Sequence, residues 1–116
     1  MEDVKDKFSA LRKGLLELVV LRLVSSHPVY AADVLKSLKQ TEFATGEGTL
    51  YPLLSKLRRD KLLEYEWIES ESGPPRKYYK LTSEGKSRLK SLSDYWNQLH
   101  TSIEQIGSNH EQSNDN

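Results

Sequence analysis

The residues whose types and spacing are best suited to chemistry lie in segment 49–59, which reads TLYPLLSKLRR. On a helix turning about 100° per residue, the apolar side chains fall on one side: Leu50, Leu53, Leu54 and Leu57. The other side carries hydrogen-bond donors, positive charge and small residues: Gly48, Tyr51, Pro52, Ser55, Lys56 and Arg59. Such a face has little to bury against in a protein interior. Its properties are those of a helix that lies in a DNA groove.

Catalytic and metal-binding chemistry have little support elsewhere in the chain. The absence of cysteine excludes disulfides, thiolate catalysis and cysteine-based metal sites. His27, His100 and His110 are scattered, with no second ligand at metal spacing. We find no nucleophile–base pair and no glycine-rich phosphate loop in the sequence. We therefore expect no enzyme activity, no metal and no cofactor.

Length and hydropathy favour one soluble folding unit. The chain has 116 residues, which is typical of a single domain. No apolar run approaches the ~18 residues needed to span a bilayer, and the charged N-terminus is unlike a signal peptide. A chain without cysteine fits a reducing compartment most simply. We expect a cytoplasmic protein with no membrane contact.

The charge is balanced overall but segregated along the chain. Formal net charge is zero, yet residues 56–61 carry four Lys/Arg against one acid, and residues 76–90 carry six against one. Segments 62–75 and 91–116 each carry four acids and no Lys/Arg. This pattern is typical of a DNA-facing surface on an acidic body, although ordinary clustering of surface charge would give it too.

Two further helices are expected before the basic one. Residues 8–25 have apolar positions at helical spacing and, in their second half, on nearly all sides. Such a helix is central, and we expect it to contact a second subunit as well. Residues 31–39 predict a second helix, so the order is that of a helix-turn-helix. Pro52 costs little if the basic helix starts at Thr49, and bends it if the start is near Gly46. The sequence leaves both open.

A hairpin is expected after the three helices. Residues 62–70 alternate as a strand, residues 76–82 as its antiparallel partner, and residues 71–75 as the turn. We expect Tyr65 and Trp67 to point into the core. A hairpin with a basic tip after a helix-turn-helix is typical of a wing that reaches DNA.

A long helix, 83–106, is expected to follow the hairpin. Its apolar residues are spaced 3, 4, 3, 4, 3, the spacing of a coiled-coil seam: Leu89, Leu92, Trp96, Leu99, Ile103 and Ile106. Such a stripe needs a partner. The simplest is the same helix of a second subunit, and the alternative is the chain's own body. Residues 107–116 have no apolar side chain, and we expect them to be disordered.

The chain contains two linked motifs, GTLYPLL at 48–54 and GPPRKYYKLTSEG at 73–85. A third segment, KGLLE at 13–17, lies in the first expected helix. Together they resemble the signature of the PadR family of bacterial winged-helix transcription regulators, over about residues 8–106. The chain's length and single C-terminal helix resemble the family's short subgroup. One difference is VYAADVL at 29–35, where the family commonly has Tyr-Gly-Tyr-Glu-Leu. Tyr30 stands for one of those tyrosines.

The resemblance implies a homodimer that binds a pseudo-palindromic operator, usually as a repressor. By two-fold symmetry the half-sites would lie one helical turn of DNA apart, about 34 Å. The helix bearing Tyr51 would lie in the major groove, Arg76 and Lys77 would belong to the wing, and the helix after Gly85 would form the dimer interface. The expected fold is mainly α with a small β-hairpin. Residues 1–82 would form the winged helix-turn-helix domain and residues 83–106 the dimerisation helix.

The expected sites follow from the face, the stripe and the resemblance. Double-stranded DNA would be contacted by Tyr30, Gly48, Thr49, Tyr51, Pro52, Ser55, Lys56, Arg59, Arg76 and Lys77. The dimer interface would comprise Leu11, Leu15, Leu89, Leu92, Trp96, Leu99, Ile103 and Ile106. Arg58, at the edge of the apolar face, is expected to form a surface ion pair.

Trp96 allows two interpretations. It can simply fill the seam, or its bulk can hold the two helices apart and leave a gap for a planar aromatic effector beside Leu15. Some PadR relatives that sense toxic compounds bind planar ligands between dimer-interface aromatics, which is the basis of the second interpretation.

Two other functions fit the same sequence. One is a winged-helix adaptor that binds protein, which would explain the acidic strand and zero net charge. The other is a ligand-binding dimer that does not bind DNA.

Overall fold

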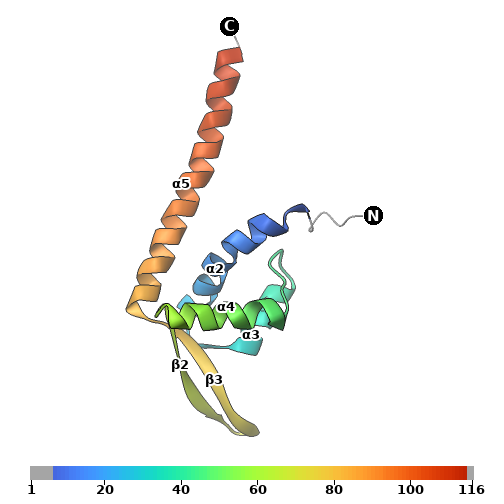
Figure 1. Cartoon of the computed structure of the whole chain (residues 1–116), viewed down its shortest axis with the longest axis vertical. Helices are drawn as coiled ribbons and strands as arrows, with labels where there is room; N and C mark the ends of the chain where they lie inside the picture. The colour runs from blue at the N-terminus through green and yellow to red at the C-terminus, as the bar shows by residue number, and fades with distance from the viewer. Residues whose placement is uncertain (1–6, 115–116) are drawn as a thin grey trace.

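The computed structural model describes the backbone of residues 7–114 and the side chains of residues 7–108. Its elements in chain order are α2 (Ser9–Ser25), β1 (Val29–Tyr30), α3 (Ala31–Lys39), α4 (Glu47–Arg59), β2 (Leu63–Ser70), β3 (Gly73–Leu81) and α5 (Ser83–Asn114). In Figure 1, α2, α3 and α4 form a body, the β2–β3 hairpin extends from one end, and α5 projects from the other. The predicted fold, mainly helical with a small sheet and a long C-terminal helix, is confirmed. No helix within residues 7–114 is long and apolar enough to cross a membrane.

One core holds the body together. Leu21 of α2 and Leu50 and Leu57 of α4 are fully buried, and Val34 of α3 and Leu63 of β2 are nearly so. These side chains belong to one hydrophobic cluster. Burying a leucine stabilises a fold by about 1.5–3 kcal/mol, so the apolar face of α4 fixes that helix against the body and leaves its polar face outside.

The sheet has three antiparallel strands in the order β1-β3-β2. The sequence did not predict β1, whose two residues are too few for alternation. The hairpin turn is also tighter than the predicted 71–75, because Ser70 pairs with Gly73. Pro74 and Pro75 therefore lie within β3. They are tolerated there because β1 pairs with β3 only at Tyr78 and Tyr79, so the prolines border a free edge.

α4 begins at Glu47, so Pro52 lies inside the helix. Pro52 has no N–H, and the bond that would end on the Gly48 carbonyl is missing. Of the two starts that the sequence left open, the helix therefore has the one near Gly46.

The direction of α5 is set by a tight joint. The Thr82 hydroxyl donates to the Lys61 carbonyl at 2.6 Å and accepts from the Gly85 N–H at 2.9 Å. Gly85 is packed so closely on the Leu62 backbone that a Cβ would collide with its carbonyl oxygen. Only glycine fits here, because α5 and the residue that precedes β2 meet without room for a side chain.

α5 is longer than predicted. It runs to Asn114, so the expected disorder from residue 107 is wrong up to that residue, and residues 115–116 lie outside the described residues. A single interior glycine, Gly107, costs a helix only about 1 kcal/mol.

The expectation that Trp67 is buried is also wrong. Tyr65 packs against the core, but Trp67 is 63% exposed. Both lie on the same face of β2, yet the hairpin extends past the body before it reaches Trp67. The alternation of side chains along β2 correctly placed Trp67 on the same face as Tyr65. It could not show how far along the strand the core extends.

Candidate DNA-binding surface

α4 presents three sides. Its leucines face the core, and a flank bearing Lys56 faces α2. The outward side carries four exposed residues that the sequence predicted as DNA contacts: Gly48, Pro52, Ser55 and Arg59. Three of the four have small or no side chains, and space beside Gly48 is open, since a Cβ there would meet nothing within 4 Å. A surface of this shape can approach a groove floor closely.

Tyr51 lies beside the outward side, turned towards the sheet. It is 39% exposed. Its pKa is raised by desolvation and, to a smaller extent, by the charges of Glu47 and Tyr30. Tyr51 in turn contributes to the raised pKa of Tyr79, for which burial is the largest cause. Tyr51 therefore stays a neutral phenol at pH 7, able both to donate and to accept a hydrogen bond.

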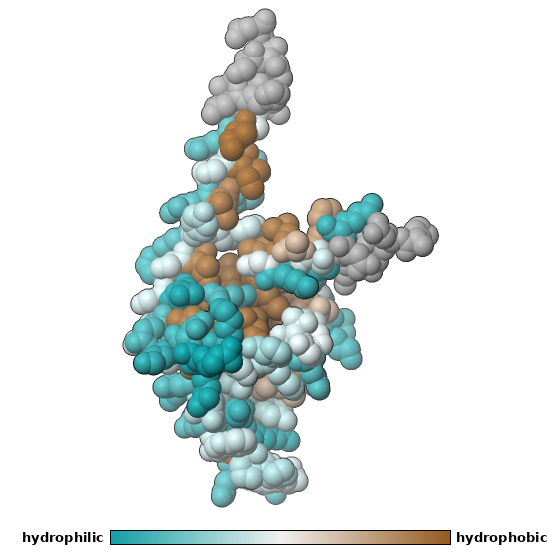
Figure 2. Space-filling model, viewed as in Figure 1, coloured by the Kyte–Doolittle hydropathy of each residue, from teal (hydrophilic) through white to brown (hydrophobic). Residues whose placement is uncertain are grey.

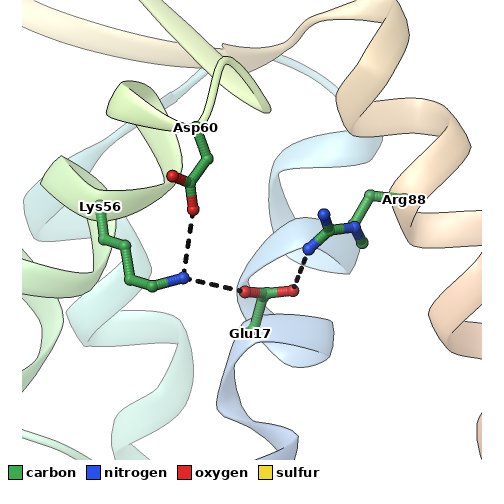
Figure 3. A network of polar contacts seen from close by, with 4 residues as sticks. All are labelled: Glu17, Lys56, Asp60 and Arg88. Atoms are coloured by element: carbon green, nitrogen blue, oxygen red, sulfur yellow. Dashed lines mark hydrogen bonds and ion pairs between the residues drawn. The ribbon is translucent and has the colours of Figure 1, made fainter.

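Lys56 is engaged with the body. Its Nζ lies 3.1 Å from Asp60 Oδ2 and 3.9 Å from Glu17 Oε1, and the other Glu17 oxygen lies 3.2 Å from Arg88 (Figure 3). The network joins α4, α2 and α5. Thr49 lies on the same flank, where it lines hollows between α4 and α2. These two predicted contacts thus stand apart from the outward side.

The two basic wing residues point to opposite faces of the hairpin. Arg76 pairs across the sheet with Ile68, and Lys77 with Trp67. The Arg76 guanidinium lies 4.9 Å from the centre of the Tyr30 ring. Lys77 Nζ lies 4.3 Å from the Tyr65 ring centre and 5.5 Å from that of Trp67. Both cations are held over aromatic rings, an arrangement that fixes them without neutralising their charge.

Arg58 has a different role from the one that the sequence predicted. Its guanidinium stacks 4.3 Å from the Tyr65 ring centre, and it has no carboxylate partner among the described side chains. The expected surface ion pair is therefore wrong. Arg58 follows Tyr51 by seven residues and shares its side of the helix, so spacing held a signal that it belongs with Tyr51.

An apolar hollow of about 490 Å³ lies where α2, α3 and α5 approach. Leu15 and Trp96, the two residues predicted to hold an effector, both line it. Arg22 also lines the hollow, and it donates a 2.7 Å hydrogen bond to Ser93 Oγ of α5.

The apolar stripe of α5 divides into two parts. Leu89 and Leu92 pack against the core of their own chain. Further along, Trp96 is 37% and Ile106 68% exposed, with Leu99 and Ile103 between these values. Leu11 of α2 is 60% exposed. Figure 2 shows hydrophobic side chains along the projecting part of α5 and in the angle between α5 and α2. For Leu89 and Leu92, the alternative partner, the chain's own body, is therefore the one observed.

No group of three or more His, Cys, Asp and Glu side chains that could hold a metal occurs in the described part of the chain.

Comparison with known proteins agrees with this arrangement. The model of the transcriptional regulator PadR-like family matches residues 20–91. Among solved structures, a PadR-like transcription factor from Bacteroides fragilis is 46% identical, with a TM-score of 0.74 over 87% of this chain and 98% of that one. A PadR family transcriptional regulator from Eggerthella lenta is 33% identical, with a TM-score of 0.79 over 89% and 90%.

Two further relatives extend the comparison. A PadR-like regulator from Bacillus cereus is 32% identical, with a TM-score of 0.76 over 84% of this chain and 95% of that one. An uncharacterised protein of Lysinibacillus sphaericus is 29% identical over 91 residues, or 76% of this chain and 84% of its own. The protein therefore belongs to the PadR-like family of DNA-binding transcriptional regulators.

Proposed function

We propose that the protein is a homodimeric repressor that inserts α4 of each subunit into the major groove of a pseudo-palindromic operator. The observation that carries the proposal is the outward side of α4. It is exposed, carries small residues beside Arg59, and is bordered by Tyr51, Arg58 and the cationic wing. Such a face suits base-edge contact, and the flanking cations suit phosphates.

The second subunit is proposed from the projecting part of α5. Leu99, Ile103 and Ile106 continue a seam spacing and are exposed in the single chain. Exposed apolar stripes of this kind are usually covered by a partner. Pairing along α5 would bring the two α4 helices to a fixed separation, which for consecutive major grooves is about 34 Å.

The effector is proposed to be a planar aromatic molecule in the hollow lined by Leu15 and Trp96. The lining is mostly apolar, and it includes residues of both α2 and α5. A ligand there would act by binding one arrangement of these helices better than another, since only differential affinity shifts a population. Titration of tryptophan emission with planar aromatic compounds tests this, and unchanged emission with all of them would contradict it.

The decisive experiment is selection of bound DNA from a random pool by the purified protein. We expect an inverted repeat with half-sites one helical turn apart. Affinity should fall steeply with salt as counterions are released. Arg59→Ala should lower the slope of log affinity against log salt by about one. Lys56→Ala should change it less, because Lys56 is held by Asp60 and Glu17.

The rival is a winged-helix adaptor that binds protein. Acidic residues on β2 and the zero net charge favour it. Such a protein would select no DNA sequence and would show a flat response to salt. A ligand-binding dimer without DNA affinity would bind aromatics while Tyr51→Ala left its activity unchanged.

A further inference from the structure

The hairpin has two chemically different faces. Where pairing is regular, Leu63, Tyr65 and Trp67 of β2 share a face with Lys77, Tyr79 and Leu81 of β3. Glu64 and Glu66 point to the opposite face, where Glu64 pairs with Lys80 at 3.6 Å. The regularly paired carboxylates are therefore kept off the aromatic face, which bears Lys77, a cation with no carboxylate partner among the described side chains.

Trp67 is the most exposed part of that face. It is 63% exposed, and its indole meets the Tyr65 ring edge-on, at 6.2 Å between centres and 87° between planes. Lys77 Nζ lies 5.5 Å from the indole centre, and the rings of Tyr65 and Tyr79 complete its surroundings at 4.3 and 6.0 Å. The indole and the ammonium thus hold each other in place while both remain accessible from solvent.

The face continues onto α4. Arg58 stacks on the middle ring of the same aromatic row, 4.3 Å from the Tyr65 ring centre. Tyr51 lies close enough to Tyr79 to influence its pKa. Arg58 therefore connects α4 to the aromatic face of the hairpin, which continues from Tyr65 to Trp67 on the wing.

We propose that Trp67 and Lys77 together contact the DNA backbone beside the groove that α4 occupies. The indole would pack on a deoxyribose and the Lys77 ammonium would lie at the adjacent phosphate. The inference rests on the proposed DNA binding and adds a contact to it.

A backbone contact fits better than base readout. Trp67 lies on the flat face of the hairpin, away from its tip at Glu71 and Ser72. An indole has a single donor and cannot distinguish base pairs by pattern. A sugar offers apolar surface and its phosphate offers charge, which match the two members of the pair.

The test compares two duplexes, the selected operator and an unrelated sequence of equal length, by fluorescence anisotropy of labelled DNA. Trp67→Ala should weaken binding to both by a similar factor, roughly fivefold to tenfold, because the lost contact carries no sequence information. Trp67→Phe should recover most of the loss. Lys77→Ala should lower the salt slope by about one, whereas Trp67→Ala should leave the slope nearly unchanged.

Ile68→Ala is the matched control. Ile68 is the next residue of β2, 41% exposed, and points to the other face. It should change neither affinity. Tryptophan emission gives a second readout, since the change on adding either duplex should be lost in Trp67→Phe.

The outcomes separate this inference from the proposed function. Wild-type protein that binds neither duplex would overturn both. Wild-type binding with unaffected Trp67→Ala and unmoved emission would overturn only the wing contact. A loss confined to the operator would overturn its assignment to the backbone.

Discussion

The two halves of α5 carry the same apolar spacing and lie in opposite environments. Leu89 and Leu92 pack on the core of their own chain, whereas Ile103 and Ile106 are about two-thirds exposed. Nothing in the 3-and-4 repeat separates them. The difference arises because α5 is longer than the body beside it. The helix is fixed to the body near Gly85, and its C-terminal part projects beyond the other helices (Figure 1). The spacing therefore identifies the apolar face of α5. Whether the same chain buries that face depends on how far the body extends alongside the helix.

A glycine substitution in each half of α5 should have opposite effects on stability. Gly85→Ala places a Cβ against the Leu62 carbonyl, and we expect it to lower the free energy of unfolding by about 3 kcal/mol, since backbone cannot yield as a side chain does. Gly107→Ala meets nothing within 4 Å and should stabilise the helix by up to about 1 kcal/mol. Urea unfolding of both variants measures the effect, and equal effects would contradict the tight joint.

Truncating one apolar residue in each part of the stripe distinguishes packing within the chain from packing between subunits. Leu92→Ala should destabilise the subunit by about 2 kcal/mol at every protein concentration, because this partly buried side chain packs against the chain's own core. Ile103→Ala should leave dilute unfolding nearly unchanged and weaken self-association instead. Sedimentation equilibrium together with chemical unfolding separates the two. A dimer untouched by Ile103→Ala would remove the projecting part of α5 from the proposed interface.

Local sequence patterns determine some elements of this fold, and contacts between distant segments determine the others. Helix 31–39 and the start of α5 at residue 83 were predicted at the observed positions, because long periodic segments with clear breakers determine local structure. The two-residue β1 and the exposure of Trp67 were not, since both depend on which distant segment lies alongside. The site divides likewise. Periodicity separated the leucines of α4 from its polar side, but only the tertiary packing of α2 assigns Lys56 to a flank bound by Glu17.

Two sets of ion pairs lie along α5, and both should contribute little to stability. Glu17 is 23% exposed and faces two cations from different elements, Lys56 at 3.9 Å and Arg88 at 3.2 Å. Further along the helix, Lys90 and Asp94 form an isolated, exposed pair at 3.0 Å. Exposed pairs contribute at most about 1 kcal/mol and i,i+4 helix pairs about 0.3–0.5 kcal/mol. Double-mutant cycles should therefore give a larger coupling for Glu17 with Arg88 than for Asp94 with Lys90, with both below about 1 kcal/mol.

The two cycles also test whether the network links the helices. Because Glu17 connects α2 to both α4 and α5, Glu17→Gln should make the mutual coupling of the cations Lys56 and Arg88 more unfavourable, and Asp94→Asn should leave that coupling unchanged. If the coupling of Glu17 proved no larger than that of the isolated pair, the network would be ordinary surface charge. The joint at Gly85 would then be the stronger of the two described restraints on how α5 is set relative to α4.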